Sequence, residues 1–102
     1  AGYVAPEQAR HPDAADHRAD IYSLGCTLYH AVVGRLPFVG RSAMEVVFKH
    51  VTEPPVPPAK AAPGVPRELS DVVLRMMAKD PADRYPGYPE LRAALAAYLG
   101  DG

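Results

Sequence analysis

The chain has 102 residues, of which 48% are hydrophobic and 23% are charged. This length suggests one domain or part of one, with enough apolar residues to form a core. The formal net charge of -1 leaves no basic excess, so we expect no binding to nucleic acid. Neither a membrane span of roughly 18 apolar residues nor a signal peptide is recognisable, and we expect a cytoplasmic location.

Cysteine and histidine give no sign of a metal site. The single cysteine, Cys26, cannot form an internal disulfide, and a small free cysteine in an apolar segment is most often a packing residue. The histidines lack the paired spacing of a zinc-binding helix: His11, His17, His30 and His50. We therefore expect no metal and no cofactor to be bound by this chain.

The first half of the chain predicts two helices. A short one is expected over residues 6–10, because proline suits the first helical position and Glu7 lies at the positive helix start. A longer one is expected over residues 20–33. Asp20 is a good N-cap for this second helix, and Gly34 is a good stop after it.

The second helix is apolar on nearly every side. Ile21, Leu24, Leu28 and Val32 form one stripe, and further apolar or aromatic residues fall outside it. A helix that is apolar all round is normally buried all round. The pattern therefore predicts a central, buried helix with neighbours on every side.

A third helix is expected to begin near Ser42, where Ser42 and Glu45 have the spacing of a capping box. Its apolar stripe is formed by Met44, Val47, Phe48 and Val51. Helical spacing of this kind favours an amphipathic helix with one face against the rest of the protein.

The second half of the chain predicts two more helices. Residues 53–66 are rich in proline and should form an extended connector. A fourth helix is expected over residues 67–78, a turn-rich link over residues 80–86 and a last helix from Pro89. No segment alternates with period two for long enough to form a strand, so the sequence predicts an all-α fold of about five helices around the central one.

Four sequence blocks, taken in order, resemble the C-terminal, helical lobe of protein kinases. Residues 3–7, Y-V-A-P-E, resemble the end of the activation segment with its A-P-E motif. Residues 20–25 resemble the start of the kinase's central helix, and residues 34–38 the turn after it. Residues 80–85, D-P-A-D-R-Y, resemble the arginine motif before the last helix. Residues 1–102 are thus identified as part of a kinase domain, from the A-P-E segment to the last helix.

Further residues resemble the bacterial, eukaryotic-like serine/threonine kinases. They include Gln8 after the A-P-E motif, the Leu28-Tyr29 pair and Tyr3, where tyrosine kinases usually carry tryptophan. The resemblance implies a parent enzyme that transfers the γ-phosphate of ATP to serine or threonine of protein substrates. It also implies that ATP and magnesium are cofactors of that parent.

The chain itself contains none of the motifs that phosphoryl transfer needs. In kinases the glycine-rich loop, the strand lysine, the catalytic-loop Asp and Asn and the metal-binding Asp all precede the A-P-E motif. No H-R-D, D-F-G or G-x-G-x-x-G sequence is present here. We therefore expect no catalytic residue in the chain, no activity when it is isolated, and a role as substrate platform and scaffold.

Two roles for polar residues follow from the resemblance. Glu7 and Arg84 resemble the ion pair that ties the A-P-E segment to the arginine motif. Asp20, which its residue type alone predicts to be an N-cap, also resembles the residue that accepts hydrogen bonds from the catalytic-loop backbone in a whole kinase.

Two surfaces resemble binding regions. The wall that receives the substrate residue after the phosphoacceptor corresponds to Gly2, Tyr3, Val4 and Ala5. Because chain ends are usually poorly ordered, we favour a frayed terminus for these residues in the isolated chain. Met44, Val47 and Phe48 resemble the helix that many kinases use to dock substrates or partners. The width of their stripe instead favours a helix that faces the core.

Three functions remain open at this stage. The chain is part of a kinase, a non-catalytic kinase-like module that binds proteins, or an unrelated helical interaction domain in which the four ordered blocks are coincidence. In the first case, one side of the central helix should face an absent catalytic-loop helix and form an exposed apolar patch. We then expect low stability of the isolated chain, or self-association through this patch.

Overall fold

The computed structural model describes residues 5–10 and 16–100, and these residues form six α-helices, one 3-10 helix and no strand. The helices in chain order are α1 (Pro6–Arg10), α2 (His17–Val33), α3 (Ala43–Thr52), α4 (Pro58–Ala61), α5 (Arg67–Met76), η1 (Pro81–Asp83) and α6 (Tyr88–Leu99). The all-α prediction is therefore confirmed for the described part of the chain. The additional α-helix, α4, lies inside the proline-rich segment that we expected to be extended.

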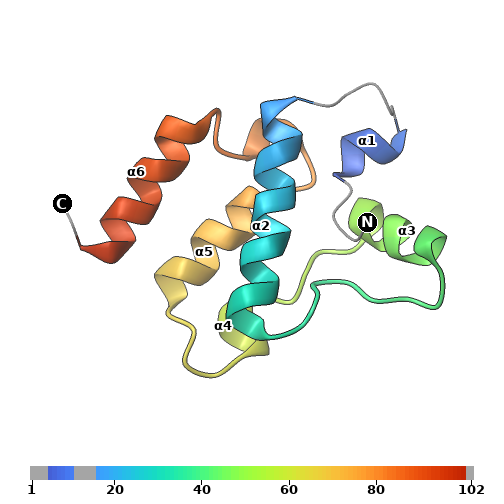
Figure 1. Ribbon diagram of the computed structural model, residues 1–102, viewed down its shortest axis with the longest axis horizontal. Helices are drawn as coiled ribbons and strands as arrows, with labels where there is room; N and C mark the ends of the chain where they lie inside the picture. The colour runs from blue at the N-terminus through green and yellow to red at the C-terminus, as the bar shows by residue number, and fades with distance from the viewer. Residues whose placement is uncertain (1–4, 11–15, 101–102) are drawn as a thin grey trace.

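The helices are arranged around α2 (Figure 1). Helix α5 packs along α2, α4 contacts both, and α6 packs against α5 at one edge of the molecule. Helices α1 and α3 contact each other on the opposite side of α2. The buried core has two clusters, and both include residues of α2 and α5. Helix α2 is therefore central, as the sequence predicted.

Helices α2 and α5 approach each other closely at Gly25. A Cβ atom added to Gly25 would lie 2.8 Å from the Cβ of Met76 and 3.0 Å from the Cγ of Met77. Ordinary carbon contacts are about 3.5–4.0 Å, so only glycine fits at this point of the interface. The absence of a side chain in the middle of α2 thus lets the two core helices pack at close range.

One side of α2 is open to solvent, which differs from the predicted burial on all sides. The fully buried residues of the helix include Ile21, Tyr22 and Cys26, whereas Leu24 is 46% exposed. The predicted stripe required Leu24 to be buried together with Ile21, and this part of the prediction was wrong. Tyr22, Cys26 and Tyr29, which fell outside that stripe, make up half of the buried residues of the helix.

The N-cap of α2 is Asp16, so the prediction that Asp20 caps this helix was wrong. The Asp16 carboxylate accepts hydrogen bonds from the backbone N–H groups of Arg18 (3.0 Å) and Ala19 (3.2 Å). Asp20 lies in the first turn, exposed, where it can still favour the positive helix end. Both aspartates satisfy the capping preference. They are one turn apart and no helix breaker separates them, so the helix extends back to the earlier one.

The ends of α2 and α3 otherwise follow the sequence signals. Gly34 ends α2 in the left-handed region, with φ of 90°. The Ser42 hydroxyl caps α3 by accepting from the backbone N–H of Glu45 at 3.1 Å. The Glu45 carboxylate reaches back to the N–H of Arg41 at 2.8 Å, one residue earlier than in a standard capping box.

The short helix α4 depends on a contact from elsewhere in the fold. Pro58 stands at its first position, where no N–H is needed, and is itself buried. The backbone N–H of Ala59 donates to the hydroxyl of Ser70 on α5 at 3.1 Å. Since the cap is a side chain of another helix, the local sequence could not reveal it.

Candidate substrate platform

Glu7 and Arg84 form a bidentate ion pair. Helix α1 places Glu7 in its first turn, and Arg84 follows the 3-10 helix η1. The two guanidinium NH2 groups of Arg84 donate to the two carboxylate oxygens of Glu7 at 2.7 and 2.8 Å. The side chain of Arg84 is 0% exposed and that of Glu7 is 16% exposed. The structure therefore brings together the two residues that the resemblance paired.

Arg84 also binds backbone carbonyl groups of the surrounding segments. It donates to Ala78 at 2.7 Å, to Arg18 at 3.0 Å and to Lys79 at 3.3 Å. Its guanidinium carbon lies 4.8 Å from the centre of the Tyr22 ring. One buried side chain thus connects α1, the start of α2 and the end of α5, and its charge is compensated on several sides.

Of the four residues predicted to form the wall of the substrate platform, only Ala5 is described. Gly2, Tyr3 and Val4 lie outside the described residues. Ala5 is 0% exposed and belongs to the core cluster that contains Tyr22. Its N–H donates to the Gln8 side chain at 3.1 Å, and its carbonyl accepts from the N–H groups of Gln8 and Ala9. The residue before α1 is therefore fixed in the core, in contrast to the frayed terminus we favoured for it.

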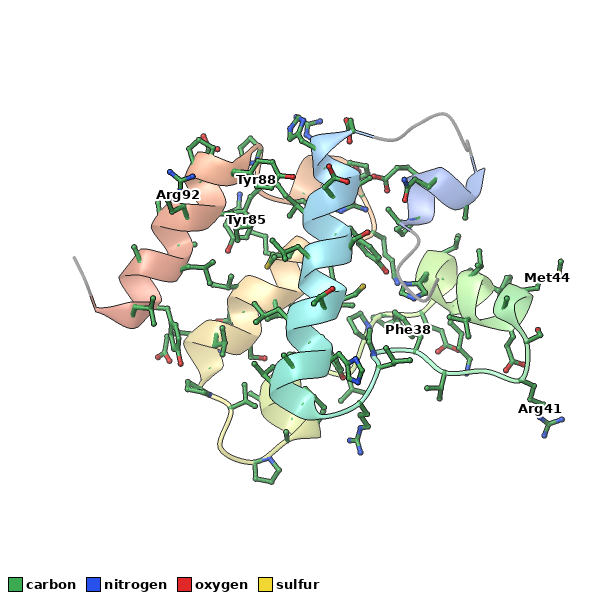
Figure 2. The ribbon with its side chains drawn as sticks, viewed as in Figure 1. Phe38, Arg41, Met44, Tyr85, Tyr88 and Arg92 are labelled. Carbon is green, nitrogen blue, oxygen red and sulfur yellow. The ribbon has the colours of Figure 1, made fainter. Side chains whose placement is uncertain are left out.

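Helix α3 presents two large apolar side chains to solvent. Met44 is 81% exposed and Phe48 is 64% exposed, whereas Val47 is half-buried. The interpretation of this stripe as a core-facing surface was therefore wrong for Met44 and Phe48. Figure 2 shows Met44 and Arg41 pointing away from the body of the molecule, each to a different side. The structure places these groups where a binding partner could contact them.

His50 is the one α3 residue that is fully buried, although the sequence analysis assigned it no role. Its Nδ1 lies 2.6 Å from the Tyr22 hydroxyl, and its ring makes T-shaped contacts with the rings of Tyr22 and Phe38. Phe38 lies between α2 and α3 (Figure 2). The position of His50 three residues after Val47, on the inner side of the helix, is the signal that could have identified it.

Burial changes the acid–base behaviour of the groups beside this ion pair. Desolvation lowers the pKa of Lys79 to about 8, assisted by the charge of Arg84 and opposed by Cys26 and Glu53. Desolvation also raises the pKa of the Cys26 thiol to about 12 and raises the pKa of the Tyr22 hydroxyl. Near neutral pH, Cys26 is therefore a protonated packing residue and a poor nucleophile.

Both members of the ion pair lie within a segment that resembles known proteins. The model of the protein kinase domain matches residues 1–94. The chain belongs to the protein kinase family. Its helices have a kinase counterpart in the crystal structure of the Rad53 kinase domain and SCD2, with a TM-score of 0.72 and 26% identity. That match covers 92% of this chain and 34% of the Rad53 chain.

Bacterial serine/threonine kinases are similar in sequence to this kinase segment. The serine/threonine-protein kinase PknB of Mycobacterium leprae is 46% identical over 95 residues, which cover 93% of this chain. The probable serine/threonine-protein kinase PknB of Bifidobacterium longum is 40% identical over 102 residues, which cover 100% of it. The chain spans about 15% of the length of each of these curated relatives.

Two negative findings concern the described residues of this kinase segment. None of its helices over residues 5–10 and 16–100 has both the length and the apolar character needed to cross a membrane. Within the same ranges, no three His, Cys, Asp or Glu side chains are grouped so that they could hold a metal ion.

Proposed function

We propose that residues 1–102 form the C-terminal helical part of a bacterial-type serine/threonine kinase domain, from the A-P-E segment to the last helix. The parent enzyme transfers the γ-phosphate of ATP to serine or threonine of protein substrates in the cytoplasm. The observation that carries this proposal is the buried, bidentate Glu7–Arg84 pair, because it joins the first kinase block of the chain to the last. The identity of 46% to a serine/threonine kinase supports it.

This chain contributes a scaffold and a substrate platform to that enzyme and holds none of its catalytic residues. In protein kinases, the groups that bind ATP and magnesium and the catalytic Asp belong to segments that precede the A-P-E motif. Those parts of the parent supply the chemistry. The isolated chain is therefore expected to be inactive.

The platform has two regions. Residues 2–5 receive the part of the substrate that follows the phosphoacceptor, and the burial of Ala5 supports a fixed position for their C-terminal end. Helix α3 docks a more distant part of the same protein substrate through Met44 and Phe48. Both side chains are apolar and largely exposed, so the docked segment should present apolar side chains to them.

When α2 is separated from the rest of the kinase domain, its open side is the region through which two copies of the chain associate. Leu24 is 46% exposed there, on a helix that is otherwise largely apolar. Sedimentation of the isolated chain should show concentration-dependent dimers, and Leu24→Ser should shift it towards monomer. A monomer at every concentration would contradict self-association and leave the kinase proposal intact.

Phosphate transfer tests the main proposal. The parent protein and the isolated chain are incubated with labelled ATP, magnesium and a generic serine/threonine protein substrate. We expect transfer by the parent only. Lack of transfer by both would favour the alternative, a non-catalytic kinase-like module in which the exposed Met44 and Phe48 of α3 bind a partner protein.

A matched pair of variants in the parent tests the platform itself. Met44→Ser and Phe48→Ser should raise the KM for a protein substrate that reaches α3 by about 3–10-fold, because each removes apolar contact area. The KM for a short peptide with the same phosphoacceptor should change less than about 2-fold. Ala59→Ser, an exposed change on α4, serves as the control. Equal effects on both substrates would contradict docking at α3.

A further inference from the structure

Helix α3 is held to the rest of the protein mainly at its C-terminal end. Met44 and Phe48 are largely exposed, and His50, in the last turn, is the single fully buried residue of the helix. Figure 1 shows α3 beside α1 and well separated from α5 and α6. The direction in which α3 presents its exposed side chains is therefore set by the contacts around its last turn.

Lys79, from the segment after α5, binds this last turn. Its Nζ donates to the carbonyl oxygen of His50 at 2.6 Å and lies 3.4 Å from that of Lys49. The ammonium group is also 4.5 Å from the centre of the Phe38 ring. A cation at this position is favoured by the negative end of the helix dipole and by the face of the aromatic ring.

The sequence explains why α3 needs this donor. In a continuing helix, the carbonyl of His50 would accept from the N–H of residue 54. Residue 54 is Pro54, which has no N–H. The carbonyl of Lys49, one residue earlier, does receive its regular bond, from Glu53 at 2.8 Å. The Lys79 ammonium therefore replaces the hydrogen bond that proline removes.

Stability alone does not account for a charged group here. Burial lowers the pKa of Lys79 to about 8, which means that the folded protein disfavours the ammonium form relative to the unfolded chain. A lysine at this position can instead fix geometry, a role that buried polar groups can have at a cost in stability.

We propose that Lys79 is a positioning residue that fixes the orientation of helix α3 and thereby determines how the parent kinase recognises its protein substrates. The inference rests on the proposed docking function of α3. The backbone carbonyl of Lys79 accepts from Arg84, and the side chain reaches α3, so this one residue relates the docking helix to the A-P-E ion pair.

The test uses the full-length parent kinase with Lys79→Met, which keeps the length of the side chain and removes its charge and N–H donors. We expect the KM for a docking protein substrate to rise about 3–10-fold, and the KM for a short peptide with the same phosphoacceptor to change less than about 2-fold. Lys79→Arg keeps the cation and should restore most of the difference. Lys60→Met, on the exposed face of α4, is the matched control.

The outcomes separate this inference from the function on which it rests. If Met44→Ser raises the KM for the protein substrate and Lys79→Met does not, the positioning role of Lys79 is refuted and docking at α3 stands. If neither variant changes the KM for the protein substrate, docking at α3 is refuted, and the role of Lys79, which rests on it, is refuted with it. If Lys79→Met unfolds the domain, Lys79→Gln provides an N–H donor without the charge, and an unchanged ratio of the two KM values in that variant would overturn the role of the cation.

Discussion

Replacing Glu7 by Gln should strongly destabilise the parent kinase domain, because it leaves the Arg84 guanidinium buried without a counter-charge. Removing one partner of a buried ion pair costs about 3–5 kcal/mol. Arg84 keeps its three backbone carbonyl partners in this variant, so we expect a loss near the lower end, about 3 kcal/mol. Arg84→Met removes the donors of all five hydrogen bonds and should cost about 4–5 kcal/mol.

Urea unfolding of the kinase domain measures both losses. With a slope of about 2 kcal/mol per molar urea, a loss of 3 kcal/mol lowers the unfolding midpoint by about 1.5 M. Asp71→Asn, an exposed change on α5, is the control and should shift stability by less than about 0.5 kcal/mol. The double variant with Glu7→Gln and Arg84→Met should lose less stability than the sum of the two single losses. Each single change already breaks the same Glu7–Arg84 ion pair, so its loss is counted only once in the double variant.

A small effect would refute the reasoning. Exposed ion pairs contribute about 0.2–1 kcal/mol. If Glu7→Gln cost no more than that, the pair would behave as a surface pair, and the exposures of 0% for Arg84 and 16% for Glu7 would misrepresent its environment in solution. Additive losses in the double variant would likewise show that the two side chains do not interact.

Three further predictions concern helices α2 and α5. Gly25→Ala should lower the free energy of unfolding by about 1–3 kcal/mol although alanine is the better helix former, because the new Cβ would meet Met76 at 2.8 Å; thermal unfolding measures this, and a stabilised variant would contradict the close packing. Asp16→Ala should cost about 1 kcal/mol through loss of the α2 N-cap, whereas Asp20→Ala should cost only a few tenths; equal losses in urea unfolding would argue against the assigned cap. Cys26 should react with a thiol reagent such as DTNB only as fast as the protein unfolds, because the thiol is buried and its pKa is raised to about 12; rapid labelling of the native protein would refute this.

Two helix-end signals that act within a few residues were predicted correctly from the sequence. Ser42 caps α3 as predicted, and Gly34 ends α2 with a positive φ. Both depend on the backbone of adjacent residues, which the local sequence determines. The predicted start of α2 was wrong because Asp16 and Asp20, one turn apart, have the same preference for the N-cap position. Only the three-dimensional course of the chain distinguishes them.

Contacts between residues far apart in the sequence could not be predicted from the periodicity of apolar residues. The cap of α4 is Ser70 of another helix, and the donor that completes α3 is Lys79. The buried face of α2 includes Tyr22, whose ring carries a hydroxyl that finds His50 of α3 as its partner. A pattern of apolar positions treats such residues as ambiguous, although their polar atoms are bonded inside the core. The Glu7–Arg84 pair, with 77 positions between its members, was reached only through the resemblance to kinases.

The position of Lys79 explains how a peripheral helix can share the rigidity of the core. Its carbonyl oxygen is one of the acceptors of Arg84, whose side chain is fully buried and bound to Glu7. Its ammonium group binds the last turn of α3, the helix whose Met44 and Phe48 are exposed. The backbone and the side chain of one residue therefore tie α3 to the same network that fixes the A-P-E helix. A change that displaces Arg84 should consequently alter the orientation of α3.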